Sequence, residues 1–418
     1  MPARAAPDRI TTIGLAQLLG MAYRGQDLTP VWDRLTARGG RDPQDAAAWM
    51  DMATILLLLG ERERGLHVQE AAIALSPLYR RPHGAADGLK VLALVAPGDF
   101  MANAPLDLLL EGSAIELHLL YCHPLRPLPA ELPEHDVCAL AIGESPENRP
   151  LLAQLQDRLA AWPCPVINGP PERIAALTRD GVCAMFAGDA RIVVPKTIRC
   201  SRSALAAGLS GLDFPIIARP VHSHAGIGLF RLEGADDLAA YLRERPEHEF
   251  YVAPFVDYRS PDGLFRKQRV AFVAGRPFIS HMAISEHWMV HYLSAGMEES
   301  AAKRAEEGRF FHDFDTGFAR RHERAFADLY ARIGLDYFGI DCAELPDGRL
   351  LVFEVDVAMI VHSLDPEHLF PYKQPAMARL FRGFQAMLGA AAASRSAPAR
   401  APAARPAIPR TPRRCPTA

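Results

Sequence analysis

The sequence predicts a protein of the mixed α/β and α+β class, and three observations lead to this prediction. From residue 89 onward, strand-like and helix-like hydrophobic patterns alternate along the chain. Residues 1–85, by contrast, carry apolar residues at helical spacing and contain few β-branched runs. At 418 residues the chain is too long for one compact core, so we expect two or three domains.

The helical region, residues 1–85, contains a pattern of small residues that predicts two antiparallel helices packed closely together. The positions that define the pattern are Trp49, Gly60, Gly65, Ala72 and Pro77. Small residues let the helices approach, and the tryptophan fills the space between them. These offsets resemble one tetratricopeptide repeat over residues 48–77, with residues 10–40 as a degenerate partner pair. Both a peptide-binding surface and a helical cap on the next domain fit this pattern.

Residues 86–195 are predicted to form a small, Rossmann-like α/β domain with helices on both faces of a parallel sheet. The expected strands are residues 90–96, 115–121, 137–142 and 165–168, and the expected helices are residues 105–111 and 147–161. A GxGxxG fingerprint is missing from the sequence, so we do not expect a dinucleotide site. Pro97, Gly98 and Asp99 follow the first strand at its carboxyl end, where open sheets bind ligands, and Asn168 follows a later strand.

Residues 338–356 are predicted to form a β-hairpin that carries three carboxylates. Because side chains alternate along a strand, Glu354 and Asp356 point to one face, and Asp341 on the partner strand can join them. Crowded carboxylates repel one another unless a cation compensates, and Mg²⁺ commonly binds one or two carboxylates together with substrate phosphates. The hairpin therefore predicts a metal site for a nucleotide. A solvent-exposed hairpin whose acidic residues only maintain solubility is the alternative.

A second motif predicts where the phosphates bind. A strand over residues 214–220 ends in the cation Arg219, and a loop of small residues follows at residues 222–228. Backbone N–H groups in such a loop can approach phosphate oxygens, and the guanidinium adds a permanent positive charge beside them. The loop residues expected to bind the nucleotide are Ser223, His224, Gly226 and Gly228.

Together, the loop and the hairpin resemble the ATP-grasp superfamily, in particular its glutathione synthetase and RimK-like branch. The resemblance covers residues 89–389 and implies an ATP-grasp domain at residues 196–390, preceded by the small α/β domain. In this fold two α+β subdomains clasp ATP, and a linker strand, here residues 251–256, holds the adenine. Carried over to this chain, the adenine contacts are Ala253, Pro254 and Phe255, and the metal ligands are Asp341, Glu354 and Asp356. One or two Mg²⁺ ions are implied, with Mn²⁺ as an alternative.

Three residues depart from the pattern of this superfamily. Arg219 stands where a lysine is usual, which keeps the charge but binds phosphate with a planar fork. Asp356 replaces the usual asparagine and adds a negative charge, and Pro254 replaces a glutamate in the adenine linker. We expect these changes to affect the catalytic rate more than the fold.

The resemblance implies an ATP-dependent ligase that forms an amide through an acyl phosphate. We assign Arg219, Lys267 and Arg269 to the stabilisation of phosphate groups, since Lys267 and Arg269 share one face of a predicted strand. Lys196 is expected to reach a phosphate as well. The candidates for substrate contact or proton transfer are His281, His291 and His362, because imidazole titrates near neutral pH.

The substrates follow less directly from the sequence. The reaction needs ATP, a carboxylate and an amine, and the helical region suggests that the carboxylate belongs to a peptide or protein. One alternative is a catalytically impaired ATP-binding scaffold or sensor. Another is a phosphotransferase on the same fold, which would deliver phosphate to a hydroxyl group.

The bulk composition limits the partners and the location. A net charge of −3 points to neither nucleic acid nor a membrane surface. The seven cysteines include no CxxC pair, which is typical of a reduced, cytoplasmic protein. Residues 391–418 are rich in Ala, Pro and Arg and are predicted to be a disordered tail. A homodimer is the default expectation for a soluble enzyme.

Overall fold

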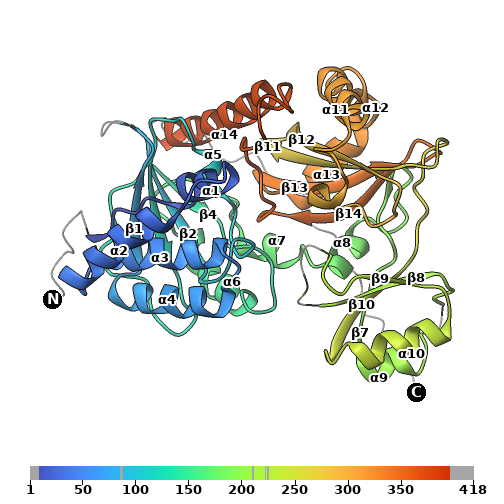
Figure 1. Ribbon diagram of the computed structural model, residues 1–418, viewed down its shortest axis with the longest axis horizontal. Coiled ribbons are helices and arrows are strands. Elements are labelled where there is room, and N and C mark those ends of the chain that lie inside the picture. The colour runs from blue at the N-terminus through green and yellow to red at the C-terminus, as the bar shows by residue number, and fades with distance from the viewer. Residues whose placement is uncertain (1–8, 85–87, 210, 222, 224–225, 396–418) are drawn as a thin grey trace.

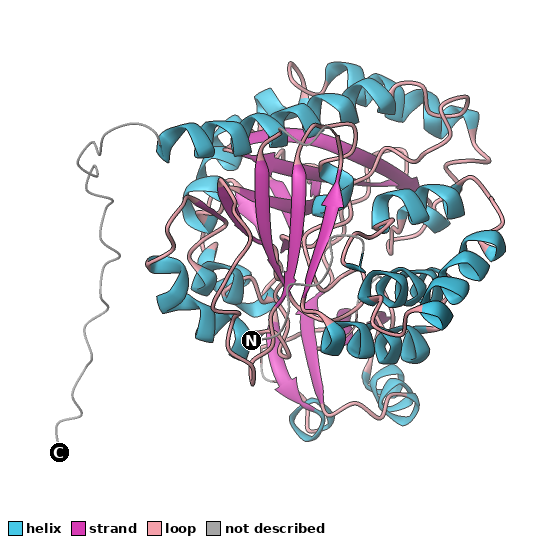
Figure 2. Cartoon of the chain, turned by 90° about the vertical axis from the view of Figure 1, so that its left-hand side faces the viewer, coloured by secondary structure: helices cyan, strands magenta, loops and turns pink. Residues whose placement is uncertain are grey.

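The computed structural model describes residues 9–84, 88–209, 211–221, 223 and 226–395 (Figure 1). These residues form a mixed α+β structure with three β-sheets, which confirms the predicted class. In Figure 1 the N-terminal helices and the first sheet lie on the left, and the other two sheets lie on the right. A second view shows the strands running through the centre of the molecule with helices around them (Figure 2).

Four helices form the N-terminal region. They are α1 (Leu15–Tyr23), α2 (Thr29–Arg41), α3 (Ala46–Leu58) and α4 (Arg62–Leu75). The turn between α3 and α4 contains Gly60 at φ 80°, and a Cβ atom on Gly65 would lie 2.8 Å from Leu57 Cγ. The predicted close approach of two helices is therefore present, whereas the tetratricopeptide identity stays a prediction. Helices α1 and α2 pack on α3 through a cluster that includes Leu18, Leu35 and Ile55.

The first sheet has the strand order β1-β3-β2-β4-β5. Its strands are β1 (Leu78–Pro82), β2 (Lys90–Val95), β3 (Glu116–Tyr121), β4 (Val137–Leu140) and β5 (Val166–Ile167), and the helices beside it are α5 (Leu106–Leu109), α6 (Arg149–Ala160) and α7 (Pro171–Ala175). Strands β2 to β5 are parallel, as predicted. The helical region ends earlier than residue 85, because residues 78–82 pair with β3 as an antiparallel strand.

Asn168 does not face a ligand site. Its side chain accepts a hydrogen bond from Tyr337 N and donates one to Tyr337 O, both at 2.8 Å. The residue is 2% exposed, so it fixes the end of β5 to the third sheet instead. The position of Asn168 after a strand suggested a ligand site, because the sequence does not show which segment packs against the end of that strand.

The second and third sheets are mostly antiparallel. The second sheet, of order β7-β10-β8-β9, contains β7 (Ile198–Ser201), β8 (Ile216–Pro220), β9 (Phe230–Leu232) and β10 (Glu249–Pro254), with helices α9 (Arg202–Ala206) and α10 (Ala235–Glu244). The third, of order β12-β11-β13-β14-β6, contains β6 (Ile192–Val193), β11 (Phe265–Val273), β12 (Arg276–Ser285), β13 (Tyr337–Glu344) and β14 (Leu350–Asp356).

Helices cover the third sheet. They are α8 (Arg179–Met185), α11 (Ala301–Asp313), α12 (Phe318–Arg321), α13 (Glu323–Ile333) and α14 (Lys373–Arg395), and a 3₁₀ turn, η2, spans Tyr292–Ser294. Phe272 of β11 packs edge-on against Phe326 of α13 in the largest core cluster. Helix α14 continues to Arg395, so the predicted loss of regular structure is wrong for residues 391–395. Residues 396–418 lie outside the described part of the chain.

Two β-bulges interrupt the third sheet at the same level. One lies where β11 pairs with β12, at Arg269 and Val270, and the other lies where β13 pairs with β14, at Asp341 and Cys342. Bulges turn side chains out of the regular alternation and are common next to active sites. In the part of the chain that the structure describes, none of the helices has the length and apolar character to cross a membrane.

Candidate active site

A cavity of about 730 Å³ lies between the second and third sheets and extends to the N-terminal helices. This volume is in the range of about 300–1,000 Å³ that is usual for small-molecule sites. Its walls include β8 and β10 on one side and β11 and β14 on the other, together with the loop of Pro97, Gly98 and Asp99. The predicted ligand-binding role of this loop position is therefore consistent with its place in the structure.

Asp341 is the counter-ion of two predicted phosphate-binding cations. Its carboxylate accepts hydrogen bonds from Lys267 Nζ at 3.0 Å and from Arg269 Nε and Nη2 at 2.8 and 3.1 Å. Burial opposes ionisation of Asp341, but Arg269 and Lys267 hold its pKa well below the usual range. Because both oxygens are occupied, Asp341 is poorly placed as a metal ligand. It holds the two cations at the cavity surface instead.

Glu354 is paired with an arginine that sequence reasoning missed. Arg179, the first residue of α8, donates from Nη2 to Glu354 Oε1 at 2.6 Å and from Nη1 to Phe353 O at 3.2 Å. Burial disfavours the Glu354 carboxylate, yet the charges of Arg179 and Arg219 lower its pKa. Thr178 caps the helix through a hydrogen bond from Gly181 N, which fixes the position of Arg179.

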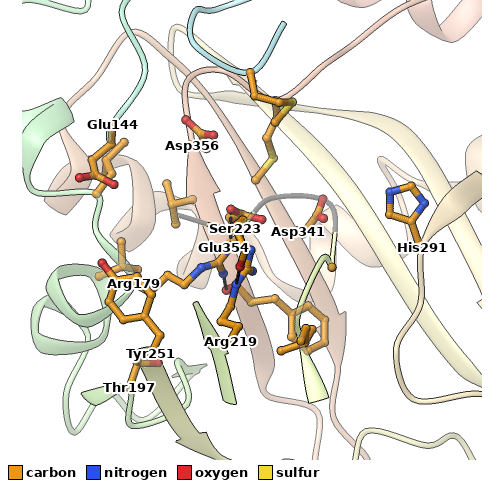
Figure 3. Close-up of a pocket in the computed structure, with 18 of the residues that line it drawn as sticks. Glu144, Arg179, Thr197, Arg219, Ser223, Tyr251, His291, Asp341, Glu354 and Asp356 are labelled. Carbon is orange, nitrogen blue, oxygen red and sulfur yellow. Dashed lines mark hydrogen bonds and ion pairs between the residues drawn. The ribbon is translucent and has the colours of Figure 1, made fainter. Parts of the chain in front are cut away.

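Asp356 differs from both neighbouring carboxylates because no cation pairs with it in the described structure. One oxygen accepts a hydrogen bond from Ala358 N at 2.9 Å. Burial and the charges of Glu354 and Glu144 raise the pKa of Asp356 to about 7. Negative charge at this position is thus undercompensated, and Figure 3 shows Asp356 and Glu354 on one wall.

The three predicted metal ligands, Asp341, Glu354 and Asp356, differ in how well their surroundings suit a divalent cation. Within the described residues, no three His, Cys, Asp or Glu side chains are grouped so that they could hold a metal ion. Glu354 and Asp356 nevertheless offer hard oxygen donors with excess negative charge, which suits Mg²⁺ bound jointly with phosphates. The residues present therefore fit the ion at these two positions and not at Asp341.

Arg219 lies at the end of β8 and is tied to the loop that follows it. Its Nε donates to Ser223 Oγ at 3.1 Å and its Nη2 donates to Ser223 O. The residue is 8% exposed, and burial with the nearby charge of Arg179 lowers its pKa to about 10. Arg179 and Arg219 therefore form a second pair of cations beside the one at Asp341.

Only some of the loop residues that were predicted to bind the nucleotide line the cavity. Ser223 and Gly226 line the cavity, whereas Gly228 does not. Gly228 has φ 69°, and a Cβ atom there would lie 2.8 Å from Pro220 Cδ, so this glycine permits a close turn. His224 lies outside the described residues. Lys196 is exposed and does not line the cavity, although Pro195 and Thr197 on either side do.

The predicted adenine linker lines an apolar part of the cavity. Ala253, Pro254 and Phe255 all contribute to its wall. Phe255 packs edge-on against Trp288 with 5.7 Å between ring centroids, and Tyr258 donates a hydrogen bond to Trp288 O. A flat aromatic ring could insert between these apolar groups and the opposite wall.

Three predicted histidines line the cavity, His281, His291 and His362. Burial and the charges of Lys267 and Arg269 lower the pKa of His291. Burial likewise lowers the pKa of His281 and of His362. All three imidazoles are therefore neutral near pH 7. In Figure 3, His291 lies across from Arg179 and points toward the side of Asp341.

Tyr23 and Arg62 of the N-terminal helices also line the cavity, which the sequence did not indicate. Arg62 pairs with Asp99 at 2.9 Å, and Gln69 exchanges two hydrogen bonds with the backbone of Gly98. No local signal marks these residues, because their contacts join segments that are distant in the sequence. The helical region is thus part of the cavity wall.

Among known proteins, this chain shows similarity to solved structures only. No protein-family model matches the chain, and no curated protein matches it either. A RimK domain ATP-grasp protein from Sphaerobacter thermophilus is 16% identical, with 71% of this chain and 99% of that chain covered and a TM-score of 0.41. The VanG D-Ala:D-Ser ligase from Enterococcus faecalis is 11% identical, with 72% of this chain and 100% of that chain covered and a TM-score of 0.46. The D-alanine–D-alanine ligase from Bacillus anthracis in complex with ATP is 12% identical, with 74% of this chain and 99% of that chain covered and a TM-score of 0.44.

Proposed function

We propose that this protein is an ATP- and Mg²⁺-dependent ligase that joins a carboxylate to an amine through an acyl phosphate. One observation carries the proposal. One cavity, beside an apolar slot, is lined by four cations and two carboxylates. The cations are Arg179, Arg219, Lys267 and Arg269. Of the carboxylates, Glu354 is paired with Arg179 and Asp356 has no cationic partner among the described residues. A polyanion with an aromatic base and a divalent cation matches this distribution of charge and apolar surface.

Glu354 and Asp356 would hold the Mg²⁺ ion. When bound, the ion neutralises charge on the phosphates and orients them. Arg179 keeps Glu354 ionised and in place, and Asp356 lines the cavity while one of its oxygens accepts a hydrogen bond from Ala358 N. Arg219, fixed by Ser223, would contact the phosphates from the side of the second sheet.

In the proposed reaction a carboxylate oxygen of the first substrate attacks the γ-phosphorus of ATP, and ADP leaves. The amine of the second substrate then attacks the acyl carbon, and inorganic phosphate leaves with the bonding electrons. Lys267 and Arg269 would stabilise the negative charge that develops on the phosphoryl and carbonyl oxygens. Asp341 holds both cations rigidly, so little reorganisation is needed.

His291 is the proposed acceptor of the proton that the amine loses. Its imidazole is neutral because burial and the nearby cations lower its pKa, and a neutral ring nitrogen can accept a proton. His291 is near enough to Lys267 and Arg269 for their charges to lower its pKa, which supports a role on the side of the cavity where the acyl phosphate would form. A peptide or protein substrate and a homodimer stay predictions from the sequence.

Calorimetric titration of ATP, with and without Mg²⁺, tests the nucleotide site. Wild-type protein should bind ATP in a Mg²⁺-dependent manner, and Glu354→Gln should weaken that binding about tenfold or more. Glu323→Gln is the matched control, because Glu323 is an exposed partner of Arg320 outside the cavity. Equal binding by both variants, or binding without Mg²⁺ dependence, would contradict the assignment.

Product analysis separates the ligase from its alternatives. A screen of carboxylate and amine pairs should yield ADP and free phosphate in step with an amide. ADP together with a stable phosphate ester would indicate a phosphotransferase. ATP binding without turnover across the screen would indicate a scaffold or sensor.

A further inference from the structure

Helix α1 reaches the candidate active site through Tyr23, its last residue. Tyr23 is 41% exposed, and it lines both the main cavity and a side cavity of about 30 Å³. Its ring centroid lies 5.0 Å from that of His362, and a Cβ atom on Gly20 would lie 3.5 Å from Leu364 Cδ2. The end of α1 therefore packs directly on residues 362–364.

The segment that Tyr23 contacts is also held by a cation of the proposed reaction. Arg269 donates a hydrogen bond from Nη1 to Ile360 O at 3.2 Å, in addition to its bonds with Asp341. Ile360 and His362 both line the main cavity and the side cavity. Tyr23 and Arg269 thus contact the same short segment, so both belong to the end of the cavity that the proposed reaction gives to the substrate.

The hydrogen bonds of His362 determine which of its ring nitrogens carries a proton. Leu364 N donates to His362 Nδ1 at 3.2 Å, so Nδ1 carries no proton of its own. Burial is the main cause of the lowered pKa of His362, and the ring is therefore neutral near pH 7. A neutral imidazole has one N–H group, which is then at Nε2, 3.3 Å from Tyr23 OH.

His362 therefore donates to the hydroxyl oxygen of Tyr23, and the hydroxyl proton remains for another acceptor. Partial burial raises the pKa of Tyr23, and the charges of Asp365 and Glu298 add to this shift, so the hydroxyl keeps its proton near pH 7. In the part of the chain that the structure describes, His362 is the one hydrogen-bond partner of this hydroxyl. The donor function of Tyr23 is thus available to a ligand in the cavity.

We propose that Tyr23 binds the substrate by donating a hydrogen bond from its hydroxyl to a carboxylate or carbonyl oxygen, so that α1 completes the substrate end of the cavity. Both kinds of oxygen accept hydrogen bonds without donating one. His362 has a positioning role, because it orients the hydroxyl and has no ring nitrogen free to take a proton from the amine. The inference rests on the proposed function, since the substrate would react in the same cavity.

The tautomer of His362 tests the first step of this inference. Long-range ¹H–¹⁵N NMR on the full chain with ¹⁵N-labelled histidine reports which ring nitrogen is protonated, and His362→Gln identifies the signal by its loss. We expect the proton on Nε2 at pH 7.5, and a shift of its signal in Tyr23→Phe, which lacks the accepting oxygen. A proton on Nδ1 would overturn the inference, because Tyr23 would then donate to Nε2 and have no proton left for a substrate.

Acetate and acetamide, followed by ligand-observed NMR, test the donor role of Tyr23 with the two kinds of oxygen. Tyr23→Phe should weaken binding about three- to tenfold, as expected for the loss of one hydrogen bond. A loss for acetate indicates a carboxylate, and a loss for acetamide indicates a neutral carbonyl group. Tyr79→Phe is the matched control, because Tyr79 lines neither cavity and its hydroxyl has no hydrogen-bond partner among the described residues.

Equal binding of each probe to wild type and Tyr23→Phe, or no binding of either probe to wild type, would overturn the inference. If Tyr23→Phe is too unstable to study, the tautomer in wild type still decides the first step. Calorimetric titration of ATP into the same proteins separates the two proposals. Wild type that binds ATP while the probes ignore the Tyr23 hydroxyl would overturn this inference alone, whereas wild type that does not bind ATP would overturn the proposed function.

Discussion

Two regions of the molecule each contain a pair of buried or half-buried aspartates, and within each pair the two carboxylates have opposite environments. The first region is the seam between helices α1 and α3 and the first sheet, with Asp107 and Asp51. Asp107 accepts hydrogen bonds from Arg81 Nε at 3.0 Å and Ala16 N at 2.6 Å, and its pKa is lowered despite burial. Burial raises the pKa of Asp51 to about 7. In the cavity wall, Asp341 corresponds to Asp107.

The two weakly compensated aspartates differ in what they face. Asp51 is 1% exposed and accepts two backbone hydrogen bonds, from Ile13 N at 2.8 Å and Gly14 N at 3.1 Å. Asp356 accepts one, from Ala358 N, and lines a cavity. Backbone donors therefore complete the first site, whereas the second has an oxygen and a negative charge available for a ligand. The difference separates a structural carboxylate from one suited to binding.

The largest effect should come from Asp341→Asn. The substitution leaves Lys267 and Arg269 partly buried without their counter-ion, and breaking a buried ion pair from one side costs about 3–5 kcal/mol. Urea unfolding should show this loss in the free energy of unfolding. Asp315→Asn, which breaks an exposed pair with Arg379, should cost about 1 kcal/mol or less. Equal losses in the two variants would contradict the structural role of Asp341.

A smaller effect is expected at the seam from Asp107→Asn. The amide can still accept the hydrogen bond from Ala16 N, but the charge-assisted bond from Arg81 is lost, at about 1.5–3 kcal/mol. Asp51→Asn at pH 8 should cost less, because it also removes an ionised group from a buried site. Urea unfolding of both variants measures the difference. A larger loss for Asp51→Asn would mean that the two aspartates are not distinguished by their cationic partners.

Much of the fold could be predicted because it depends on local patterns. Strand β2 (Lys90–Val95) and the hairpin of β13 and β14 follow from apolar alternation and the turn between them. The bulge at Asp341 and Cys342 could not be predicted, because strict alternation has no place for an extra residue. Strict alternation would put Phe353 on the face opposite Glu354 and Asp356, yet Phe353 also lines the cavity and packs against Tyr258, with 5.0 Å between ring centroids.

The candidate site was predictable to the extent that its residues lie on two short motifs. The carboxylates of the hairpin and Arg219 all line the cavity, as their sequence context indicated. Arg179 was missed because its contact with Glu354 spans 175 residues and depends on how α8 packs against β14. The engagement of Asp341 by Lys267 and Arg269 is likewise a property of sheet register, which pairs Arg269 with Asp341 across neighbouring strands.

The smallest of these effects, in Asp356→Asn, bears most directly on the comparison. In folded protein without metal the pKa of Asp356 is about 7, above its ordinary value of 3.8, so the stability that its proton contributes is complete below pH 3.8 and is lost as pH rises toward 7. The asparagine has no such loss, and its amide oxygen can still accept the hydrogen bond from Ala358 N.

The free energy of unfolding of Asp356→Asn minus that of wild type should therefore be larger at pH 8 than at pH 5. We expect a difference on the order of 1–2 kcal/mol in EDTA. Urea unfolding at the two pH values measures this difference. Adding Mg²⁺ with ATP at pH 8 should stabilise wild type more than the variant, because only wild type offers a second carboxylate to the ion. Asp51→Asn provides the contrast, since its stability relative to wild type should not respond to Mg²⁺. A response at Asp51 and none at Asp356 would reverse the assignment of the structural and the binding carboxylate.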